Sequence, residues 1–138
     1  MSNYEPNYII DDGLVYVETE DKEDKIKIPR LLPCGYRVLV KFQEAMEVTE
    51  SGIIIAQESD SKRREELSEV EGILVAVGAD AWRDRSGKYN PWAKIGQRVT
   101  YARFAGKVLT DPDDPENEYF VMNDEDIIAI IPPKETNK

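Results

Sequence analysis

The sequence predicts an all-β fold, and three observations carry that prediction. Its apolar runs are short and rich in valine and isoleucine, glycine, proline and aspartate interrupt them, and no ten-residue stretch repeats its apolar positions every 3.6 residues. A chain of 138 residues fits one domain of ordinary size. About seven short strands in its main body predict a small barrel or sandwich.

Residues 1–30 are expected to form an N-terminal extension that contains a small β-hairpin. Two apolar runs, 8–10 and 14–17, flank Asp11-Asp12-Gly13, where a glycine can adopt the positive φ of a tight turn. The following residues, 18–25, are a charged run that cannot be buried. They predict an acidic linker to the main body.

The main domain is expected over residues 31–133, with a tail at 134–138. Residues 36–42 alternate apolar and polar side chains from Val38 onward, which predicts a half-buried strand. The continuous apolar run from Gly72 to Gly78 is typical of a strand covered on both faces. Further short strands are expected at 25–28, 99–101, 107–109, 119–122 and 127–131, the last of them ended by Pro132-Pro133, which cannot continue a ladder.

Two connections are long for such a domain, and long loops are commonly functional. In the first, about 44–71, Gly52 precedes Ile53, Ile54 and Ile55, and a polar run over 57–66 follows. Composition alone favours a core strand for this triplet. The alternative is a mobile recognition loop whose apolar tip stays exposed until a partner covers it, and the polar run supports it because it offers almost nothing to bury.

The second long connection, about 79–94, holds Trp82 and Trp92 among arginine and lysine residues. Aromatic and basic side chains together would suit single-stranded nucleic acid. The alternative is a hairpin that turns at Ser86-Gly87 and pairs the two tryptophans across its strands. We favour the hairpin and expect no nucleic-acid partner, because a net charge of −10 repels polyphosphate.

The composition excludes several kinds of site. Histidine is absent and Cys34 is the only cysteine, so catalytic triads, Cys-His nucleophiles, zinc clusters and internal disulfides are excluded, and Cys34 is expected to be a packed or inert thiol. The acidic clusters at 111–116 and 124–126 read as solvated turns, since they lack the spacing of a calcium loop. No apolar run is long enough to span a bilayer, and the N-terminus lacks the positive charge of a signal peptide. We therefore expect a cytoplasmic protein that is not an enzyme, with no metal, cofactor or membrane partner.

Taken in order, the segments resemble the GroES family of co-chaperonins, the chaperonin-10 type, over about residues 28–131. The resemblance rests on four motifs in the order that the family has them. They are Pro33-Cys34-Gly35-Tyr36-Arg37-Val38-Leu39-Val40-Lys41, the Glu71–Gly78 run, Lys94-Ile95-Gly96, and Asn117–Met122 followed by Asp124–Ile130.

The resemblance implies a partly open β-barrel that assembles as a homo-heptameric, dome-shaped ring and caps the folding cavity of a GroEL-type chaperonin in an ATP-dependent cycle. The partner would bind the ATP, and the enclosed cavity would hold non-native client proteins. The residues that the resemblance assigns to the mobile loop and its contact with the apical domains are Gly52, Ile53, Ile54 and Ile55. Those of the roof hairpin are Trp82, Ser86, Gly87 and Trp92. Those that would pair neighbouring subunits are Leu31, Leu32, Pro33, Ile127, Ile128, Ala129, Ile130 and Ile131.

Several features depart from the family pattern. Only Gly52 stands where a glycine pair is usual, the 56–71 segment is long, Gln97-Arg98 replaces an acidic-aliphatic pair, and the extension is additional. Bacteriophages encode divergent members of this family, so a phage origin, with function in the host cytoplasm, is a hypothesis. The alternative function is a structural or protein-interaction barrel unrelated to chaperonins, with the isoleucine triplet in its core. A dehydrogenase of GroES-like fold is excluded, because a glycine-rich nucleotide-binding half and a zinc ligand set are both absent.

Overall fold

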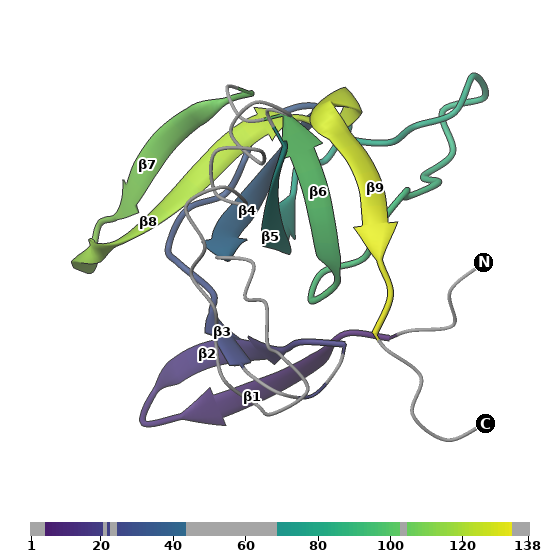
Figure 1. Ribbon diagram of the computed structural model, residues 1–138. Coiled ribbons are helices and arrows are strands. Elements are labelled where there is room, and N and C mark those ends of the chain that lie inside the picture. Colours follow the sequence, from purple (N-terminus) through teal and green to yellow (C-terminus); the bar gives the residue numbers. More distant parts are fainter. Residues whose placement is uncertain (1–4, 21, 23–24, 44–68, 103–104, 134–138) are drawn as a thin grey trace, which may run out of the picture.

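The computed structural model describes residues 5–20, 22, 25–43, 69–102 and 105–133, which form two antiparallel sheets (Figure 1). The only helical element in these ranges is a 3-10 turn at Asp124–Asp126, so the predicted all-β class is confirmed. No helix in the described part of the chain is long and apolar enough to cross a membrane.

The smaller sheet has the strand order β1-β2-β3 and comes from the N-terminal extension. It consists of β1 (Asn7–Asp11), β2 (Leu14–Glu18) and β3 (Lys25–Lys27). The backbone at Asp12 and Gly13 has φ values of 54° and 80°, the left-handed pair that a two-residue hairpin turn requires. Part of the charged run predicted to be a linker is strand, because Lys25 and Ile26 pair with Glu18 and Val17.

The larger sheet has six strands in the order β7-β8-β4-β5-β6-β9. Its strands are β4 (Arg37–Gln43), β5 (Glu69–Val77), β6 (Arg98–Ala102), β7 (Lys107–Asp111), β8 (Asp114–Asn123) and β9 (Ile127–Ile131). Three strands separate β8 from β9, yet Met122 and Ile127 belong to one buried cluster with Val40 and Leu74. The sheet is therefore curled round a core, and the barrel stays partly open between its edge strands β7 and β9.

A second buried cluster lies between the barrel and the small sheet. Val17 of β2 and Ile26 of β3 pack there with Leu39, Ile73 and Tyr119 of the barrel. Figure 1 shows the small sheet below the large one. The prediction of a half-buried strand at 36–42 is therefore wrong at Leu39, which is buried because the extension covers the outer face of β4.

Strand β5 is buried on both faces, as its continuous apolar run predicts. Leu74 enters the first cluster, whereas Ile73 and Val75 enter the second. The strand begins earlier than expected, at Glu69, so the last three residues assigned to the first long connection are strand. They pair with β6, and Val70 packs against the first cluster.

Candidate interaction surfaces

The isoleucine triplet and its glycine, Gly52 and Ile53–Ile55, lie outside the described residues. The structure shows where their segment is rooted, because Gln43 at the end of β4 pairs with Glu71 near the start of β5. Phe42, next to this root, is 44% exposed. The two strand ends that flank the segment therefore lie side by side.

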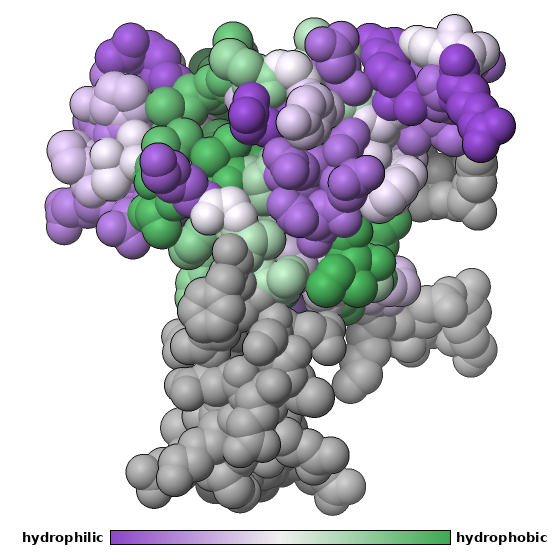
Figure 2. Space-filling view, turned by 90° about the horizontal axis from the view of Figure 1, so that it is seen from above, coloured by the Kyte–Doolittle hydropathy of each residue, from purple (hydrophilic) through white to green (hydrophobic). Residues whose placement is uncertain are grey.

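The connection between β5 and β6 brings together the tryptophans that the sequence singled out. The Trp82 and Trp92 rings stack with their centroids 6.3 Å apart, and a single bridge pairs Arg83 with Tyr89. Trp82 is 4% exposed and Trp92 is 54% exposed, so one indole is an anchor and the other lies on the surface. The outer part of this connection forms the hydrophilic projection on the right of Figure 2.

The predicted turn at Ser86-Gly87 forms the tip of this projection. Gly87 has a φ of 86°, and the Asp84 carboxylate accepts hydrogen bonds from the Ser86 hydroxyl and from the backbone N–H groups of Ser86 and Lys88. These bonds, the Ser86 hydroxyl first, lower the pKa of Asp84. Asp84 therefore holds the tip in shape as an ionised side chain.

The residue that fastens this connection to the barrel is Asp124, which was not among the predicted site residues. The Asp124 carboxylate accepts the backbone N–H of Trp82 at 2.8 Å, and the Asp124 carbonyl accepts the indole N–H at 3.2 Å. Trp82 has a φ of 53°, a conformation that a bulky residue adopts only when its surroundings impose it. The prediction of a solvated turn at 124–126 is wrong for Asp124, and nothing in the local sequence signals a partner 42 positions away.

The two segments predicted to pair between subunits lie in different places. Strand β9 is one edge of the large sheet, with Ile128 58% exposed and Ile127 buried in the first cluster. Apolar surface appears over this side of the barrel in Figure 2. In the other segment, Leu32 is 86% exposed, whereas Leu31 packs against the second cluster.

The other residues of these two segments, and Cys34 beside them, differ in their exposure to solvent. Ala129 is exposed, whereas Pro33, Ile130 and Ile131 are partly buried. Cys34 is exposed, so it is not a packed thiol. Ile127 lies in the first cluster and Leu31 packs against the second, and each segment keeps an apolar side chain in solvent, Ile128 in one and Leu32 in the other.

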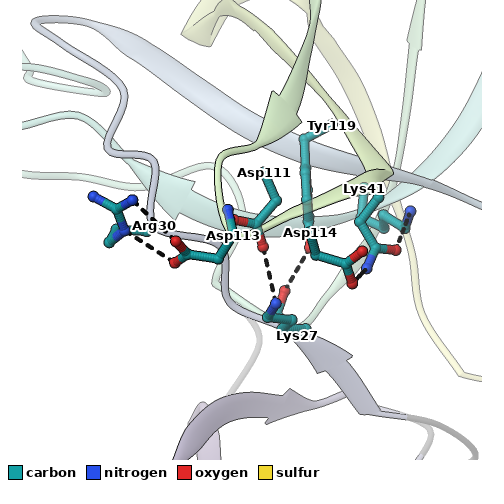
Figure 3. A network of polar contacts seen from close by, with 8 residues as sticks. Lys27, Arg30, Lys41, Asp111, Asp113, Asp114 and Tyr119 are labelled. Atoms are coloured by element: carbon teal, nitrogen blue, oxygen red, sulfur yellow. Dashed lines mark hydrogen bonds and ion pairs between the residues drawn. The ribbon is translucent and has the colours of Figure 1, made fainter.

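Charged side chains fasten the extension to the turn between β7 and β8 (Figure 3). The Lys27 ammonium lies 3.1 Å from the Asp111 carboxylate, which is fully buried, and Arg30 donates two hydrogen bonds to Asp113 at 2.9 and 3.0 Å. The prediction of a solvated turn at 111–116 is therefore wrong for Asp111. The residue is buried because β3 lies over it and supplies its counter-ion.

The charge state of this pair follows from its surroundings. Burial alone would raise the pKa of Asp111, but the backbone N–H of Asp113 and the ammonium of Lys27 outweigh it and lower the pKa. The hydrogen bond with Asp111 raises the pKa of Lys27. Both groups are therefore ionised at neutral pH, and the pair is an ionic clasp between the extension and the barrel.

Gln97, one of the departures from the family pattern, is the second fastening point. It is 1% exposed, its side-chain oxygen accepts the backbone N–H of Lys94 at 2.8 Å, and its amide donates to the Glu20 carboxylate at 3.2 Å. The backbone N–H of Glu20 also donates to the carbonyl of Gly96. A glutamine here satisfies both a backbone donor and an acidic side chain of the extension, which an acidic residue could not do.

Comparisons with known proteins cover the barrel and not the extension. The family described as "Chaperonin 10 Kd subunit" matches residues 30–131. The co-chaperonin GroES of Natranaerobius thermophilus is 37% identical over 101 residues, which are 73% of this chain and 97% of that protein. The co-chaperonin GroES of Staphylococcus aureus strain JH9 is 33% identical over 101 residues, 73% of this chain and 98% of that protein.

Proposed function

Because this chain belongs to the chaperonin 10 family and is a homologue of GroES co-chaperonins, which are not enzymes, we propose that it caps the folding cavity of a GroEL-type chaperonin in an ATP-dependent cycle. The observation that carries this proposal is the match over nearly the whole length of a GroES co-chaperonin. The chain supplies the lid, and the chaperonin binds the ATP.

The contact with the apical domains is assigned to Gly52, Ile53, Ile54 and Ile55. Burying three isoleucine side chains contributes roughly 5 to 9 kcal/mol. Ordering a flexible backbone costs about 1 to 2 kcal/mol per residue, so one loop binds weakly. A ring presents several loops at once, and its avidity exceeds the affinity of one site by about 10² to 10⁴. Small ATP-driven changes in each partner site are summed over the ring and release the lid.

In the proposed assembly, β9 pairs with the segment at Leu31–Pro33 of the next subunit and closes a ring, for which the family implies seven copies. The exposure of Leu32 and Ile128 supports this arrangement, because an apolar sheet edge left in solvent promotes aggregation and pairing removes the hazard. The roof would be formed by the connection with Trp82, Ser86, Gly87 and Trp92, above a cavity that holds non-native clients. The site of action is the cytoplasm, that of a host cell if the chain has the predicted phage origin.

The test is capture by a purified bacterial GroEL in the presence of ATP, measured by sedimentation. Ile54→Asp abolishes capture and leaves the ring assembled, whereas Ser59→Asp, which adds the same charge to the polar run of the segment, binds like the wild type. Capture of the Ile54→Asp ring at wild-type strength refutes the assignment of the loop. A wild-type ring that GroEL never captures favours the alternative, an interaction barrel without a chaperonin.

A further inference from the structure

The connection between β5 and β6, residues 78–97, carries its outer part, 83–90, away from the barrel. Near the start of the connection Asp124 binds the backbone and the indole of Trp82. Among the described residues, every hydrogen bond of the outer part stays within the connection itself. The barrel therefore holds the connection near its base, and no such bond fixes the direction of the outer part.

The N-terminal extension contacts the far end of this connection at two places. The Glu5 carboxylate, before β1, lies 3.2 Å from the Lys94 ammonium. Glu20, after β2, donates its backbone N–H to the Gly96 carbonyl at 3.0 Å, and its carboxylate accepts the Gln97 side-chain amide at 3.2 Å. Figure 1 shows the start of β6, which these residues precede, above the small sheet. We call the contacts of Glu5 and Glu20 with the connection the brace.

A third contact reaches from the extension to the outer part of the connection. Tyr8 of β1 lies near Tyr89, which a single bridge pairs with Arg83 and whose ring the Arg83 guanidinium approaches to 5.5 Å. Burial first, and the phenol of Tyr8 as well, raise the pKa of Tyr89 against the opposing charge of Arg83. The outer part thus has a neighbour in the extension, on the same strand that Glu5 precedes.

We propose that Glu5 and Glu20 are positioning residues, which hold the connection at one angle to the barrel and so fix where its tip stands in the roof of the lid. The consequence for the roof rests on the proposed function. A segment held at one point can pivot about that point, whereas contacts separated along its length fix its direction. The brace supplies such contacts at the end of the connection opposite to Trp82 and Asp124.

The two contacts of the brace differ in strength. The Glu5–Lys94 pair is exposed and contributes little by itself. The bond between Glu20 and Gln97 is charge-assisted, and Gln97 is 1% exposed, so this contact is the stronger one. The extension can carry a load because the ionic clasp and the second buried cluster fix it to the barrel.

The brace is an addition to the barrel that the relatives share. The family match begins at residue 30, and the match to the co-chaperonin of Natranaerobius thermophilus covers 97% of that protein. Too little of the relative remains outside the match for a counterpart of residues 1–29. A connection of this kind therefore exists without a brace in that relative, and in this chain the brace restricts its movement.

A distance within one chain tests the proposal. Arg85 lies at the tip of the connection and Glu116 on β8, and both are exposed. In a Cys34→Ser background, Arg85→Cys and Glu116→Cys supply the only thiols for two spin labels. Electron paramagnetic resonance measures the distance between the labels in full-length rings diluted with unlabelled chains, so that distances between subunits do not contribute. The labelled parent is expected to give a narrow distribution.

Three variants alter the brace. Glu5→Lys/Glu20→Ala removes both carboxylates and is expected to broaden and shift the distribution of distances. Lys94→Glu opposes Glu5 from the side of the connection, leaves the extension unaltered, and is expected to cause a smaller change in the same direction. Glu5→Lys/Lys94→Glu restores opposite charges and is expected to return the distance of the labelled parent.

The matched control is Asp11→Lys/Asp12→Asn, at the turn of the same hairpin. It changes the net charge by the same amount as Glu5→Lys/Glu20→Ala, and it also removes an exposed ion pair, that of Asp11 with Lys25. Asparagine tolerates the left-handed φ at position 12. The control is expected to keep the distance of the labelled parent, and circular dichroism confirms that each variant is folded.

The consequence for the lid is measured as the retention of a client. GroEL is loaded with a small dye-labelled non-native protein and capped with each ring in the presence of ATP. A roof whose tips change direction opens more often, so the ring with Glu5→Lys/Glu20→Ala is expected to release the dye-labelled protein faster than the wild-type ring. The ring with Asp11→Lys/Asp12→Asn is expected to retain it like the wild type.

The other outcomes overturn the proposal or separate it from the proposed function. Parent-like distances in both Glu5→Lys/Glu20→Ala and Lys94→Glu overturn the positioning role. Equal broadening in the control also overturns it, because net charge and not the brace would then be the cause. A changed distance with wild-type retention overturns the role in the roof. If GroEL never captures the wild-type ring, the proposed function fails, while the distances still support or overturn the positioning of the connection.

Discussion

The hydroxyl of Tyr119 donates to the backbone carbonyl of Lys27 at 3.0 Å and thereby joins β8 of the barrel to β3 of the extension. Tyr101 of β6 is equally buried, but its hydroxyl finds no hydrogen-bond partner among the described residues. Burial raises the pKa of both phenols to about 12, so titration does not distinguish them. The two side chains differ instead in hydrogen bonding, since only the Tyr119 hydroxyl has an acceptor among the described residues.

Removing the two hydroxyls is therefore expected to have opposite consequences. Tyr119→Phe leaves the Lys27 carbonyl without its donor and lowers the free energy of unfolding by about 1 kcal/mol. Tyr101→Phe removes a buried polar group that makes no bond, so stability is unchanged or rises by up to about 1 kcal/mol. Urea denaturation of both variants measures the difference, and equal losses would contradict the contrast between the two sites.

The ionic clasp between Lys27 and Asp111 predicts how the stability of the fold depends on pH in the acid range. The folded state lowers the pKa of Asp111 below its ordinary value of 3.8, so ionised Asp111 stabilises the fold above that pH. This contribution is lost as the pH falls through the lowered pKa. We expect Asp111→Asn to lower the melting temperature at pH 7 by about 4 °C or more, and the gap to the wild type to narrow below pH 4.

The control for this experiment is Asp11→Asn. Asp11 makes a longer contact with Lys25, 3.6 Å, and its side chain is 65% exposed. Exposed ion pairs contribute little to stability, so its melting curves should follow the wild type from pH 2.5 to pH 7. A parallel loss in both variants would mean that general surface charge, and not the clasp, sets the acid response.

The Trp82–Asp124 contact predicts that a single carboxylate sets the environment of a distant indole. In a Trp92→Phe background Trp82 is the only tryptophan. Asp124→Ala removes the acceptor of its backbone N–H, releases a residue held at a φ of 53°, and shifts its fluorescence emission to longer wavelength. Glu125→Ala, an exposed neighbour, should leave the emission unchanged.

The fastening at Gln97 predicts a charge conflict that a second substitution relieves. Gln97→Glu replaces the amide that donates to Glu20 by a second carboxylate and destabilises the protein at pH 7. Restoring one neutral partner in Gln97→Glu/Glu20→Gln recovers most of the loss. Thermal unfolding of the two variants checks this. The introduced carboxylate still offers an oxygen to the backbone N–H of Lys94, so failure of the double variant to recover would contradict the charge conflict with Glu20 as the cause.

Local pattern was sufficient to predict the strands, and distant contacts were not predictable. Alternation and apolar runs place strands near all nine observed ones, because strand formation follows from side chains close in sequence. The alternating pattern of β4 placed Leu39 on the exposed face. The side chains that cover it, Val17 and Ile26, belong to another sheet, and nothing in the sequence around Leu39 indicates them.

Asp111 and Asp124 were missed for a related reason. Both sit in acidic turns whose composition is that of solvated loops, and their partners, Lys27 and Trp82, are 84 and 42 positions away. A lone charged residue carries no sign in the sequence of whether a partner will fold over it. The isoleucine triplet lies outside the described residues, so the choice between its two interpretations, core strand and recognition loop, stays a prediction.

Because Val17 and Ile26 complete the second buried cluster, removal of the extension alone would expose apolar side chains of the barrel. A descendant that shed residues 1–29 would leave Leu39 and Ile73 in water, and it would persist only after polar substitutions at those two sites. Whether a related chain carries the extension should therefore be reflected in the side chains at these two positions on the outer face of β4 and β5, apolar with the extension and polar without it.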